Sequence, residues 1–453
     1  MSGRMSARTA DVVIVGAGLA GLAAARALSQ EYDVMVVEAR GRVGGRTVGH
    51  TFANGVTVEM GGQWVGPTHA ELLRLVEQLG LETFPTYDEG DGLTIHGARH
   101  RWEGASLGLP AHAEAEIERL HGLIGELADE IPLEAPWRAP GAADLDRQTV
   151  ESWLVDATAD PIARTYFRVL TPAIFGAETS ELAWLWFLFY ARSGGSLDYL
   201  ITTSAGAQEL RVVGGSHRIA EAMAAALPAG SLVLGSPVER IRQTDDAAHV
   251  VHASGEIVAR QAIVTLPPAL AGRFAYEPAL PAQRDALTQA FPMGSVIKFQ
   301  MLYDEPWWRG AGLSGQVVSF DDPISTTFDN SPPDGSCGVL LAFAEGAHAR
   351  RLAALSERQR RRTVLACLGR FFGGAATDPR DYVELDWMTE PFTRGCYGGR
   401  PGAGVLTSFG HALREPVNRL RWAGAESSAI SCGYMDGAVR SGIQAARDVA
   451  AAL

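Results

Sequence analysis

Two apolar, β-branched runs near the start of the chain flank a helical segment. Residues 11–15 (DVVIV) and 34–38 (VMVVE) predict short buried strands, because the strands of a parallel sheet are apolar on both faces. Between them, a glycine turn leads into LAAARAL at 22–28, which predicts a helix. The chain therefore opens with a predicted β-α-β unit.

Three later segments have helical patterns. Between Ala113 and Ile131, isoleucine and leucine recur at spacings of three and four, which puts one apolar stripe on a polar helix. The Pro/Ala-rich stretch 132–143 predicts a loop. Residues 181–191 are apolar almost throughout and predict a buried helix, and residues 353–372 predict a further helix.

Residues 232–266 change to short strands separated by turns. The segments LVLG, VERIRQ, HVVHA, EIVA and AIVTL predict five strands, with a hairpin turn at Ser254-Gly255. The last segment, 421–453, predicts a strand, a glycine turn and a terminal helix. The whole pattern predicts an α/β protein.

Composition narrows the class of protein. The chain has 453 residues, 47% of them hydrophobic and 20% charged, which is typical of a globular protein of two or three domains at about 150 residues each. The net charge of -13 argues against nucleic acid as a partner, because phosphate binding needs clustered Lys and Arg. An acidic field would mildly favour cationic partners.

The cysteines and the apolar segments predict neither a disulfide framework, a metal site nor a membrane-spanning helix. The cysteines at 337, 367, 396 and 432 have neither C-x-x-C spacing nor a nearby His at a ligand offset, so we expect no disulfide framework and no metal site. The apolar stretch Leu182–Ala191 is too short to cross a bilayer of about 30 Å. We expect a cytoplasmic protein that does not bind membranes.

A glycine-rich turn follows the first strand. Gly16, Gly18 and Gly21 have the spacing of the dinucleotide-binding fingerprint, and Glu38 ends the second strand, where it could accept from a ribose 2′-hydroxyl. The helix N-terminus would offer its free N–H groups to phosphates. A chance glycine turn is the alternative, but strand, helix and carboxylate occur together. The turn predicts dinucleotide binding, disfavours NADP, and leaves NAD and FAD open.

Five longer motifs are spread along the chain. They are VEARGRVGGRT at 37–47, GGQWVGPT at 61–68, MGSVIKF at 293–299, GCY at 395–397 and WAGAESS…GYMDGAV at 422–439. Together they resemble the motifs of the flavin-containing monoamine oxidase family, within the FAD-dependent amine oxidase superfamily. The resemblance covers essentially the whole chain from Asp11 onwards.

The resemblance implies FAD rather than NAD, and a fold of two interleaved domains. One would be a Rossmann-like FAD-binding domain of the p-hydroxybenzoate-hydroxylase type, and the other an α+β substrate domain. We expect the FAD-binding domain to comprise residues 8–82, 208–288 and 388–453. The substrate-binding domain would comprise residues 83–207 and 289–387.

The resemblance also implies cofactor contacts. Glu38 would hold the adenosine ribose, Val238 would lie beside the adenine, and Trp387 would face the flavin. The further contacts expected, beside the three glycines of the fingerprint, are Arg40, Gly45, Arg46, Gly61, Gly62, Gln63, Trp64, Cys396, Gly424, Glu426 and Met435.

The resemblance also implies which part of the cofactor some of these residues would contact. Arg40 and Arg46 would lie near the adenosine and pyrophosphate. Gly424 and Glu426 would contact the ribityl–pyrophosphate region, and WAG-A-E itself predicts a second glycine turn that leads into a helix.

Cys396 matches the cysteine that carries the flavin as a thioether in monoamine oxidases. Related bacterial amine oxidases lack this cysteine and bind FAD without a covalent bond. A small buried residue is the other interpretation of a free cysteine. From the GCY context we expect FAD to be attached covalently through Cys396.

Lys298 is the single lysine among 39 basic residues, and it lies in the apolar segment MGSVIKF. A buried ammonium is costly, and its pKa responds to burial where that of arginine does not. The resemblance implies that Lys298 holds a water at flavin N5 and assists the reaction with oxygen. A lysine that extends from a strand edge to solvent is the alternative.

Tyr397 and Tyr434 match two tyrosines that flank the substrate amine in monoamine oxidases. Two facing rings would receive a cationic amine by cation–π attraction and orient its lone pair once it is neutral. Ile201 and Gln208 correspond to residues that gate and line the substrate cavity. Thr326 falls where the mammalian enzymes have a bulkier group, which would widen the cavity.

These residues predict an FAD-dependent monoamine oxidase acting on a primary, hydrophobic or aromatic amine. A hydride equivalent would pass from the amine α-carbon to the flavin, the imine would hydrolyse to an aldehyde and ammonia, and O₂ would be reduced to H₂O₂. The amine and O₂ are the expected partners, with a homodimer left open. A polyamine oxidase, an L-amino acid oxidase and a non-catalytic, flavin-stabilised interaction module are the alternatives.

Overall fold

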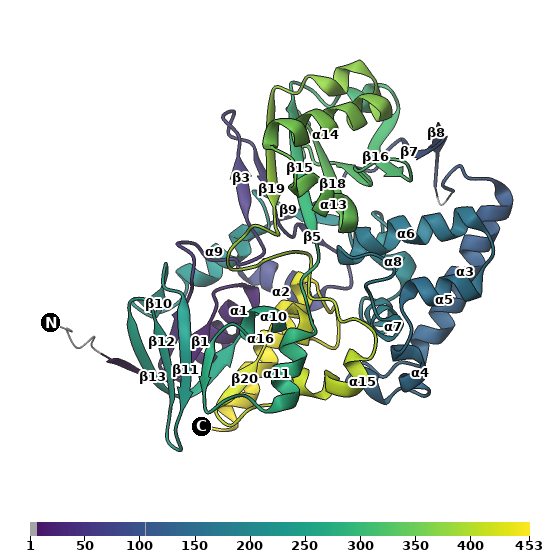
Figure 1. Ribbon diagram of the computed structural model, residues 1–453. Coiled ribbons are helices and arrows are strands. Elements are labelled where there is room, and N and C mark those ends of the chain that lie inside the picture. Colours follow the sequence, from purple (N-terminus) through teal and green to yellow (C-terminus); the bar gives the residue numbers. More distant parts are fainter. Residues whose placement is uncertain (1–6, 105) are drawn as a thin grey trace.

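Two large sheets organise the computed structural model, which describes residues 7–104 and 106–453 (Figure 1). The larger sheet has the strand order β10-β2-β1-β13-β12-β11-β14, and β20 pairs with β13. Its strands are β1 (Ala7–Val15), β2 (Val34–Val37), β10 (Leu232–Val233), β11 (Val238–Gln243), β12 (Ala248–His252), β13 (Gly255–Val264), β14 (Ala275–Glu277) and β20 (Leu420–Trp422).

The predicted β-α-β unit is confirmed at the centre of this sheet. Strands β1 and β2 pair in parallel, and α1 (Leu19–Leu28) connects them. β13 pairs in parallel with both β1 and β20, and β10 with β2, so the carboxyl ends of five strands meet at one edge of the sheet. In open α/β sheets ligands bind at this edge.

The second sheet has the order β19-β15-β18-β17-β16-β7-β8 and lies at the top of Figure 1. All eight residues of β15 are buried, and β15 is hydrogen-bonded on both sides, to β18 and β19. The strands are β7 (Asp91–His96), β8 (Ala98–Trp102), β15 (Val296–Tyr303), β16 (Leu313–Ser319), β17 (Thr326–Asp329), β18 (Gly338–Glu345) and β19 (Asp381–Asp386).

Six helices form a layer at the right of Figure 1. Their core is aromatic: Trp153 and Trp184 stack with ring centroids 4.0 Å apart, and Trp186 packs edge-on against Phe291. The helices are α3 (Ala111–Asp129), α4 (Ala142–Asp146), α5 (Val150–Ala157), α6 (Pro161–Phe175), α7 (Trp184–Ser193) and α8 (Leu197–Ile201).

The remaining elements are short strands and the helices that cover the sheets. The short strands are β3 (Gly49–Thr51), β4 (Thr57–Glu59), β5 (Trp64–Val65), β6 (Thr83–Pro85) and β9 (Leu210–Val212). The helices are α2 (Ala70–Gln78), α9 (His217–Ala225), α10 (Pro268–Ala271), α11 (Ala282–Gln289), α12 (Trp307–Gly310), α13 (Gly346–Ala353), α14 (Glu357–Phe372), α15 (Val405–Phe409) and α16 (Met435–Ala450).

The predicted helix at 353–372 and the terminal helix differ from the structure. A break separates α13 from α14, because Ser356 forms a capping box that starts a new helix. The turn after β20 leads only into a short 3-10 turn, Ala425–Ser427, and α16 begins at Met435. Ser431 and Gly433 between them have positive φ angles, which a helix does not allow.

Two other predictions are also wrong in detail. EIVA and AIVTL are one continuous strand, β13, because its parallel pairing with β1 continues across the polar residues between them. The predicted loop at 132–143 contains a 3-10 turn, Pro136–Arg138. The buried helix near 181–191, now α7, is confirmed, and so is the hairpin, but its turn is Ala253-Ser254, because Gly255 already pairs with His252 as the first residue of β13.

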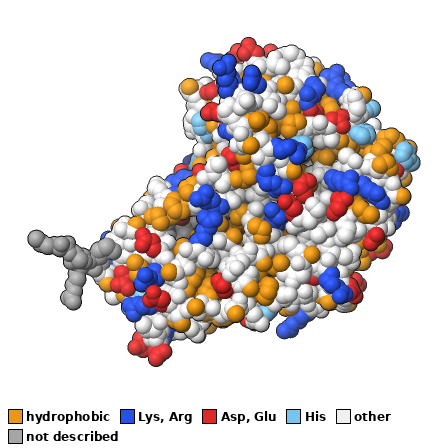
Figure 2. Space-filling view, viewed as in Figure 1, with side chains coloured by type: hydrophobic (Ala, Val, Ile, Leu, Met, Phe, Trp, Pro, Cys, Tyr) orange, Lys and Arg blue, Asp and Glu red, His pale blue; other side chains and the backbone are white. Residues whose placement is uncertain are grey.

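The two large sheets take their strands from alternating stretches of the chain. Strands β7 and β8 and then β15 to β19 form the second sheet, and strands before, between and after them form the first. We propose the domain boundaries expected from the sequence on this basis. No helix in residues 7–104 or 106–453 is long and apolar enough to cross a membrane. Figure 2 shows acidic and basic side chains mixed over one face.

The packing of α16 on α1 gives a stability prediction. A Cβ built on Gly442 would lie 2.1 Å from the backbone oxygen of Ala20, so the two helices touch through their backbones. We expect Gly442→Ala to lower the free energy of unfolding by about 1–3 kcal/mol, because the helices must separate. Urea denaturation measures this.

The matched control is Gly122→Ala, on an exposed turn of α3 where a Cβ meets no atom within 4 Å. Alanine is the better helix former, so this variant should be more stable by about 0.5–1 kcal/mol. Equal effects of the two substitutions would contradict the described contact.

Candidate active site

A cavity of about 610 Å³ extends from the carboxyl edge of the larger sheet to helices α6 and α8. Its size is typical of cofactor and small-molecule sites. We call the part lined by Gly16, Glu38 and Val238 the nucleotide end. We call the part lined by α6, α8, β16 and β17 the substrate end.

The nucleotide end has a backbone surface free of side chains. Gly16 has φ +103°, and a Cβ there would lie 2.7 Å from Thr265 Oγ1. Gly18 and Gly45 meet through their backbones, since a Cβ on Gly45 would lie 3.3 Å from Gly18 Cα. Gly18 is the N-cap of α1 and provides no side-chain cap, so the first N–H groups of the helix face the cavity edge.

Glu38 lies in this end with its carboxylate held by two backbone amides. The N–H of Ala17 donates to Oε2 at 2.8 Å, and the N–H of Arg40 donates to Oε1 at 2.9 Å. Each oxygen keeps a lone pair for another donor. The Arg40 guanidinium donates to Glu390 at 3.1 Å and to Thr393, which neutralises its charge locally.

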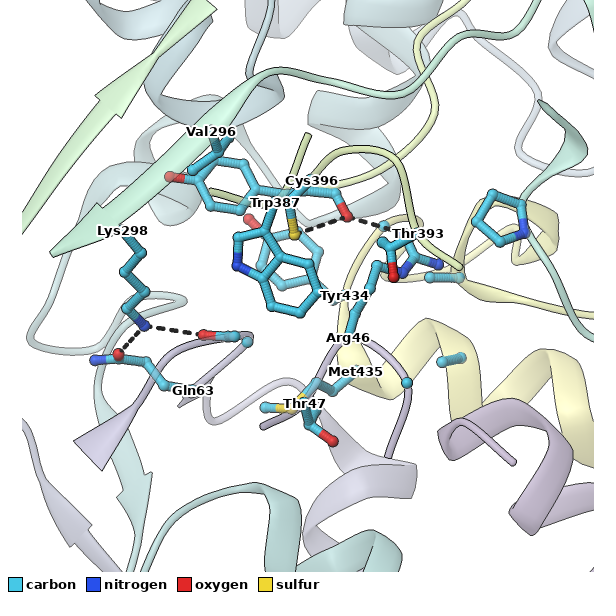
Figure 3. Close-up of a pocket in the computed structure, with 18 of the residues that line it drawn as sticks. Arg46, Thr47, Gln63, Val296, Lys298, Trp387, Thr393, Cys396, Tyr434 and Met435 are labelled. Carbon is cyan, nitrogen blue, oxygen red and sulfur yellow. Dashed lines mark hydrogen bonds between the residues drawn. The ribbon is translucent and has the colours of Figure 1, made fainter. Parts of the chain in front are cut away.

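Arg46 and Glu426 form a bidentate ion pair at 2.6 and 2.9 Å, in which the carboxylate is buried and the guanidinium partly buried. Arg46 also donates to the backbone oxygen of Tyr397 at 2.8 Å (Figure 3). Glu426 accepts a further hydrogen bond from the Gly399 N–H at 3.0 Å. Burial opposes ionisation of Glu426, yet the paired Arg46 keeps its pKa below the usual value.

The expected cofactor contacts all line the cavity, with two exceptions. Glu426 lies behind Arg46 and holds the 395–400 segment through Gly399, so its direct contact with the cofactor stays a prediction. Gly21 lies under the turn, where a Cβ would be 1.9 Å from the Gly16 backbone oxygen. Gly21 therefore permits close packing of α1.

Lys298 reaches the middle of the cavity from the buried strand β15. Its side chain is only 2% exposed, which rules out a lysine extending from a strand edge to solvent. Nζ donates to the Gly61 backbone oxygen at 2.9 Å and to Gln63 Oε1 at 2.5 Å (Figure 3). Burial lowers the pKa of Lys298 to about 7, so the ammonium can lose its proton near neutrality.

Cys396 lies opposite Lys298, close to Trp387 and Val296 (Figure 3). The thiol is buried and lines the cavity. Burial raises the pKa of Cys396 to about 12, while the nearby charges of Arg46 and Lys298 act in the other direction. Trp387 is fixed by donating to the Met60 backbone oxygen at 2.9 Å.

Tyr397 and Tyr434 both line the cavity beside Cys396. Tyr434 packs against Tyr190 of α7 and against His69, with ring centroids 6.0 and 5.2 Å apart. The hydroxyl of Tyr397 donates to Glu345 at 3.4 Å, and its ring lies edge-on to Phe343. Burial raises the pKa of both phenols, so they stay neutral.

The substrate end is mainly apolar. Ile201 is 37% exposed and also lines the cavity, which places it at the mouth. Gln208 donates to the Leu200 backbone oxygen at 2.8 Å, and its buried Oε1 has no partner among the described residues. Thr326 also lines this end, so all three pocket residues expected from the sequence reach the cavity.

Comparison with known proteins identifies the chain. Residues 19–450 match the family model of flavin containing amine oxidoreductases. The chain belongs to this family. It is 35% identical to the flavin-containing amine oxidase B of Sus scrofa, over 97% of this chain and 86% of that one.

Solved structures of amine oxidases share the fold of this family member. Putrescine oxidase bound to putrescine has a TM-score of 0.95 at 34% identity, covering 98% of this chain and 100% of that one. Cyclohexylamine oxidase from Brevibacterium oxydans has a TM-score of 0.94 at 33% identity, covering 98% and 99%. The chain is therefore an FAD-dependent oxidoreductase that acts on an amine with oxygen as acceptor, and its predicted fold class is confirmed.

The residues present fit the FAD of an amine oxidoreductase. The uncapped N-terminus of α1 and the bare glycine backbone suit a pyrophosphate, and the two spare lone pairs of Glu38 suit a ribose diol. Lys298, Trp387 and Cys396 would then surround the flavin ring.

Motif reasoning missed three buried polar residues near this site. Glu345 ends the apolar strand β18, where it contacts Tyr397, and burial raises its pKa to about 7. Gln300 lies two residues after Lys298 on the same face of β15, and Asn330 follows β17. The signal was present: polar residues within or at the ends of strongly apolar strands are costly unless they have a role.

The Arg46–Glu426 pair gives a prediction for this site. Glu426→Gln removes the countercharge of Arg46, and we expect it to lower the free energy of unfolding by about 3–5 kcal/mol, because a partly buried guanidinium is left uncompensated. Chemical denaturation of the purified protein measures this. Glu134→Gln, which breaks an exposed pair with Arg414, is the control and should cost less than about 1 kcal/mol. Similar losses in both variants would count against the described pair.

Proposed function

We propose that this enzyme oxidises primary monoamines with a hydrophobic or aromatic side chain to imines, which hydrolyse to aldehydes and ammonia. One observation carries the proposal. Among the described residues that line the cavity, Glu38 is the single acidic side chain, and it lies at the nucleotide end. The substrate end therefore offers an amine an apolar wall and no second carboxylate.

This charge pattern disfavours the two alternative substrates. The distal ammonium of a diamine would be buried at the substrate end without a countercharge, which is costly. An amino acid would need a cationic partner for its carboxylate. The arginines that line the cavity are Arg40, Arg46 and Arg273, and the first two are already paired with glutamates. Arg273 lies just before β14, whose parallel pairing with β11 places it beside Val238 at the nucleotide end.

The bound flavin would accept the hydride equivalent from the amine α-carbon and pass two electrons to O₂, which is reduced to H₂O₂. The residues of the chain prepare this reaction. Tyr397 and Tyr434 orient the amine, and the unpartnered Oε1 of Gln208 is an acceptor for an N–H at the substrate end. The apolar walls exclude water from the reacting atoms.

Lys298 is proposed to act in the oxygen half of the reaction. It holds an ammonium whose proton is exchangeable near neutral pH, directed into the cavity beside Cys396 and Trp387. Such a group can hold a water and stabilise negative charge that develops as oxygen is reduced.

Covalent attachment of FAD through Cys396 is also proposed. The buried thiol lines the cavity together with Trp387 and the two tyrosines. Burial raises its pKa to about 12, and the charges of Arg46 and Lys298 oppose that rise and favour the thiolate. Thioether formation replaces one S–H and one C–H bond by an S–C bond. The two electrons and two protons released reduce O₂ to H₂O₂.

The substrate class is tested by measuring H₂O₂ release from tyramine, benzylamine, putrescine and phenylalanine. We expect turnover of the two aromatic monoamines, with kcat/KM for putrescine and phenylalanine lower by about 100-fold or more, because each would bury an unpaired charge. Preferred turnover of putrescine would overturn the monoamine assignment, and preferred turnover of phenylalanine would support an amino acid oxidase.

The role of Lys298 is tested by Lys298→Met, which keeps the length of the side chain and removes the charge. Stopped-flow absorbance should show anaerobic flavin reduction by benzylamine within a few-fold of the parent. Reoxidation by O₂ should be slower by about 100-fold. Unchanged oxygen kinetics would refute the assignment.

The covalent bond is tested by precipitating the purified protein in acid. The yellow colour should stay with the pellet, and Cys396→Ala should release it into the supernatant as free FAD. Colour in the supernatant of the parent protein would end the covalent proposal while leaving the amine oxidation untouched.

A further inference from the structure

A chain of buried amide side chains lies behind Lys298. Gln63 Nε2 donates to Asn330 Oδ1 at 3.0 Å, and Asn330 Nδ2 donates to Gln300 Oε1 at 3.1 Å. Gln300 Nε2 donates in turn to the backbone oxygen of Glu59 at 2.9 Å. The three amides are at most 2% exposed, so water does not compete for these hydrogen bonds.

All the hydrogen bonds in this chain point in one direction. The last acceptor is a backbone carbonyl, which cannot become a donor, so Gln300 must turn its NH₂ group towards Glu59. Gln300 then presents oxygen to Asn330, and Asn330 presents oxygen to Gln63. Consequently Gln63 must present its own oxygen to the lysine.

The direction of these hydrogen bonds determines whether Lys298 presents an N–H donor or a lone pair to the cavity. Its two partners, the Gly61 backbone oxygen and Gln63 Oε1, are both acceptors. A charged lysine has three N–H donors and keeps the third for the cavity. A neutral lysine has two N–H donors, uses both on the same partners, and leaves its lone pair for the cavity.

We propose that Gln63, Asn330 and Gln300 are positioning residues that keep the exchangeable proton of Lys298 on its cavity side. The lysine then passes this proton to a cavity water, or regains it from one, without any rearrangement of the protein. The inference deepens the proposed role of Lys298 in the oxygen reaction and depends on that role.

None of the charged and titratable groups around Lys298 orients its proton, so the amides determine that orientation. Glu59 and Arg211 form a buried ion pair at 3.1 Å, so their opposite effects on the ammonium partly cancel. Cys396 is the third such group, and it carries no charge at neutral pH, either as a thiol whose pKa is raised by burial or as the proposed thioether. The flanking side chains on β18 and β19 are Phe343 and Leu385, which carry no charge.

The test is the pH dependence of flavin reoxidation by O₂ in two variants of the chain. Gln63→Glu puts a carboxylate against the ammonium and should raise the apparent pKa of reoxidation by about one unit or more. Asn330→Leu leaves Gln63 without its acceptor, so its amide can turn an N–H towards Nζ and disfavour the charged form. That variant should lower the apparent pKa.

Opposite shifts support the inference, because a loss of packing alone would not produce two signs. Shifts in the same direction, no shift in either variant, or a parent reaction that does not titrate would overturn it. If Asn330→Leu does not fold, Gln300→Leu interrupts the chain one step further away and carries the same expectation. Gln261→Leu removes a buried amide of β13, outside the chain, and should leave the apparent pKa unchanged.

Anaerobic reduction by benzylamine is followed in every variant. Reduction that persists while the pKa fails to move contradicts the role of the amides and leaves amine oxidation standing. No reduction in the parent protein contradicts the proposed function itself.

Discussion

The site depends on one ammonium group that is buried away from bulk solvent. Transferring a charged lysine into a protein interior costs several kcal/mol, and Glu59, the carboxylate whose charge acts on it, is already paired with Arg211. Lys298 is therefore held by carbonyl oxygens instead of by a countercharge. This arrangement keeps the lysine near its neutral form, in a place where either protonation state has its hydrogen bonds satisfied.

Charged side chains are concentrated at the nucleotide end of the cavity, and the substrate end is mainly apolar. At the nucleotide end, Glu38, Arg40 and Arg46 are each fixed by hydrogen bonds or ion pairs, so these groups are already oriented for a polar cofactor. At the substrate end, α6 and α8 provide apolar walls. Lys298 and the two tyrosines lie where these environments meet, because β15 and the 395–400 segment bring them there from distant parts of the chain.

The sequence was most informative where local rules decide the structure. The β-α-β unit follows from apolar periodicity and three glycines. The lone lysine in MGSVIKF is recognisable as a functional residue because burying an ammonium in an apolar strand is costly. Motif resemblance also placed Tyr397, Tyr434 and Cys396 around one cavity. The break at Ser356 was within reach of local reasoning, since a capping box has a recognisable pattern.

Contacts between distant segments were beyond such reasoning. No spacing rule shows that Glu426 lies behind Arg46, or that β13 is one continuous strand because β1 pairs along it. The amide chain joins residues of three segments, 59–63, β15 and the turn after β17, and its direction is set by the backbone carbonyl of Glu59. Only the folded arrangement shows that these amides share one hydrogen-bonded path.

The most direct measurement is a crystal structure of the purified protein with its natural flavin. The account predicts an isoalloxazine ring between Lys298 on one side and the Tyr397–Tyr434 pair on the other, with the ADP part along Gly16, Gly18 and Glu38. A ring bound elsewhere, or a protein that retains no flavin, would contradict it.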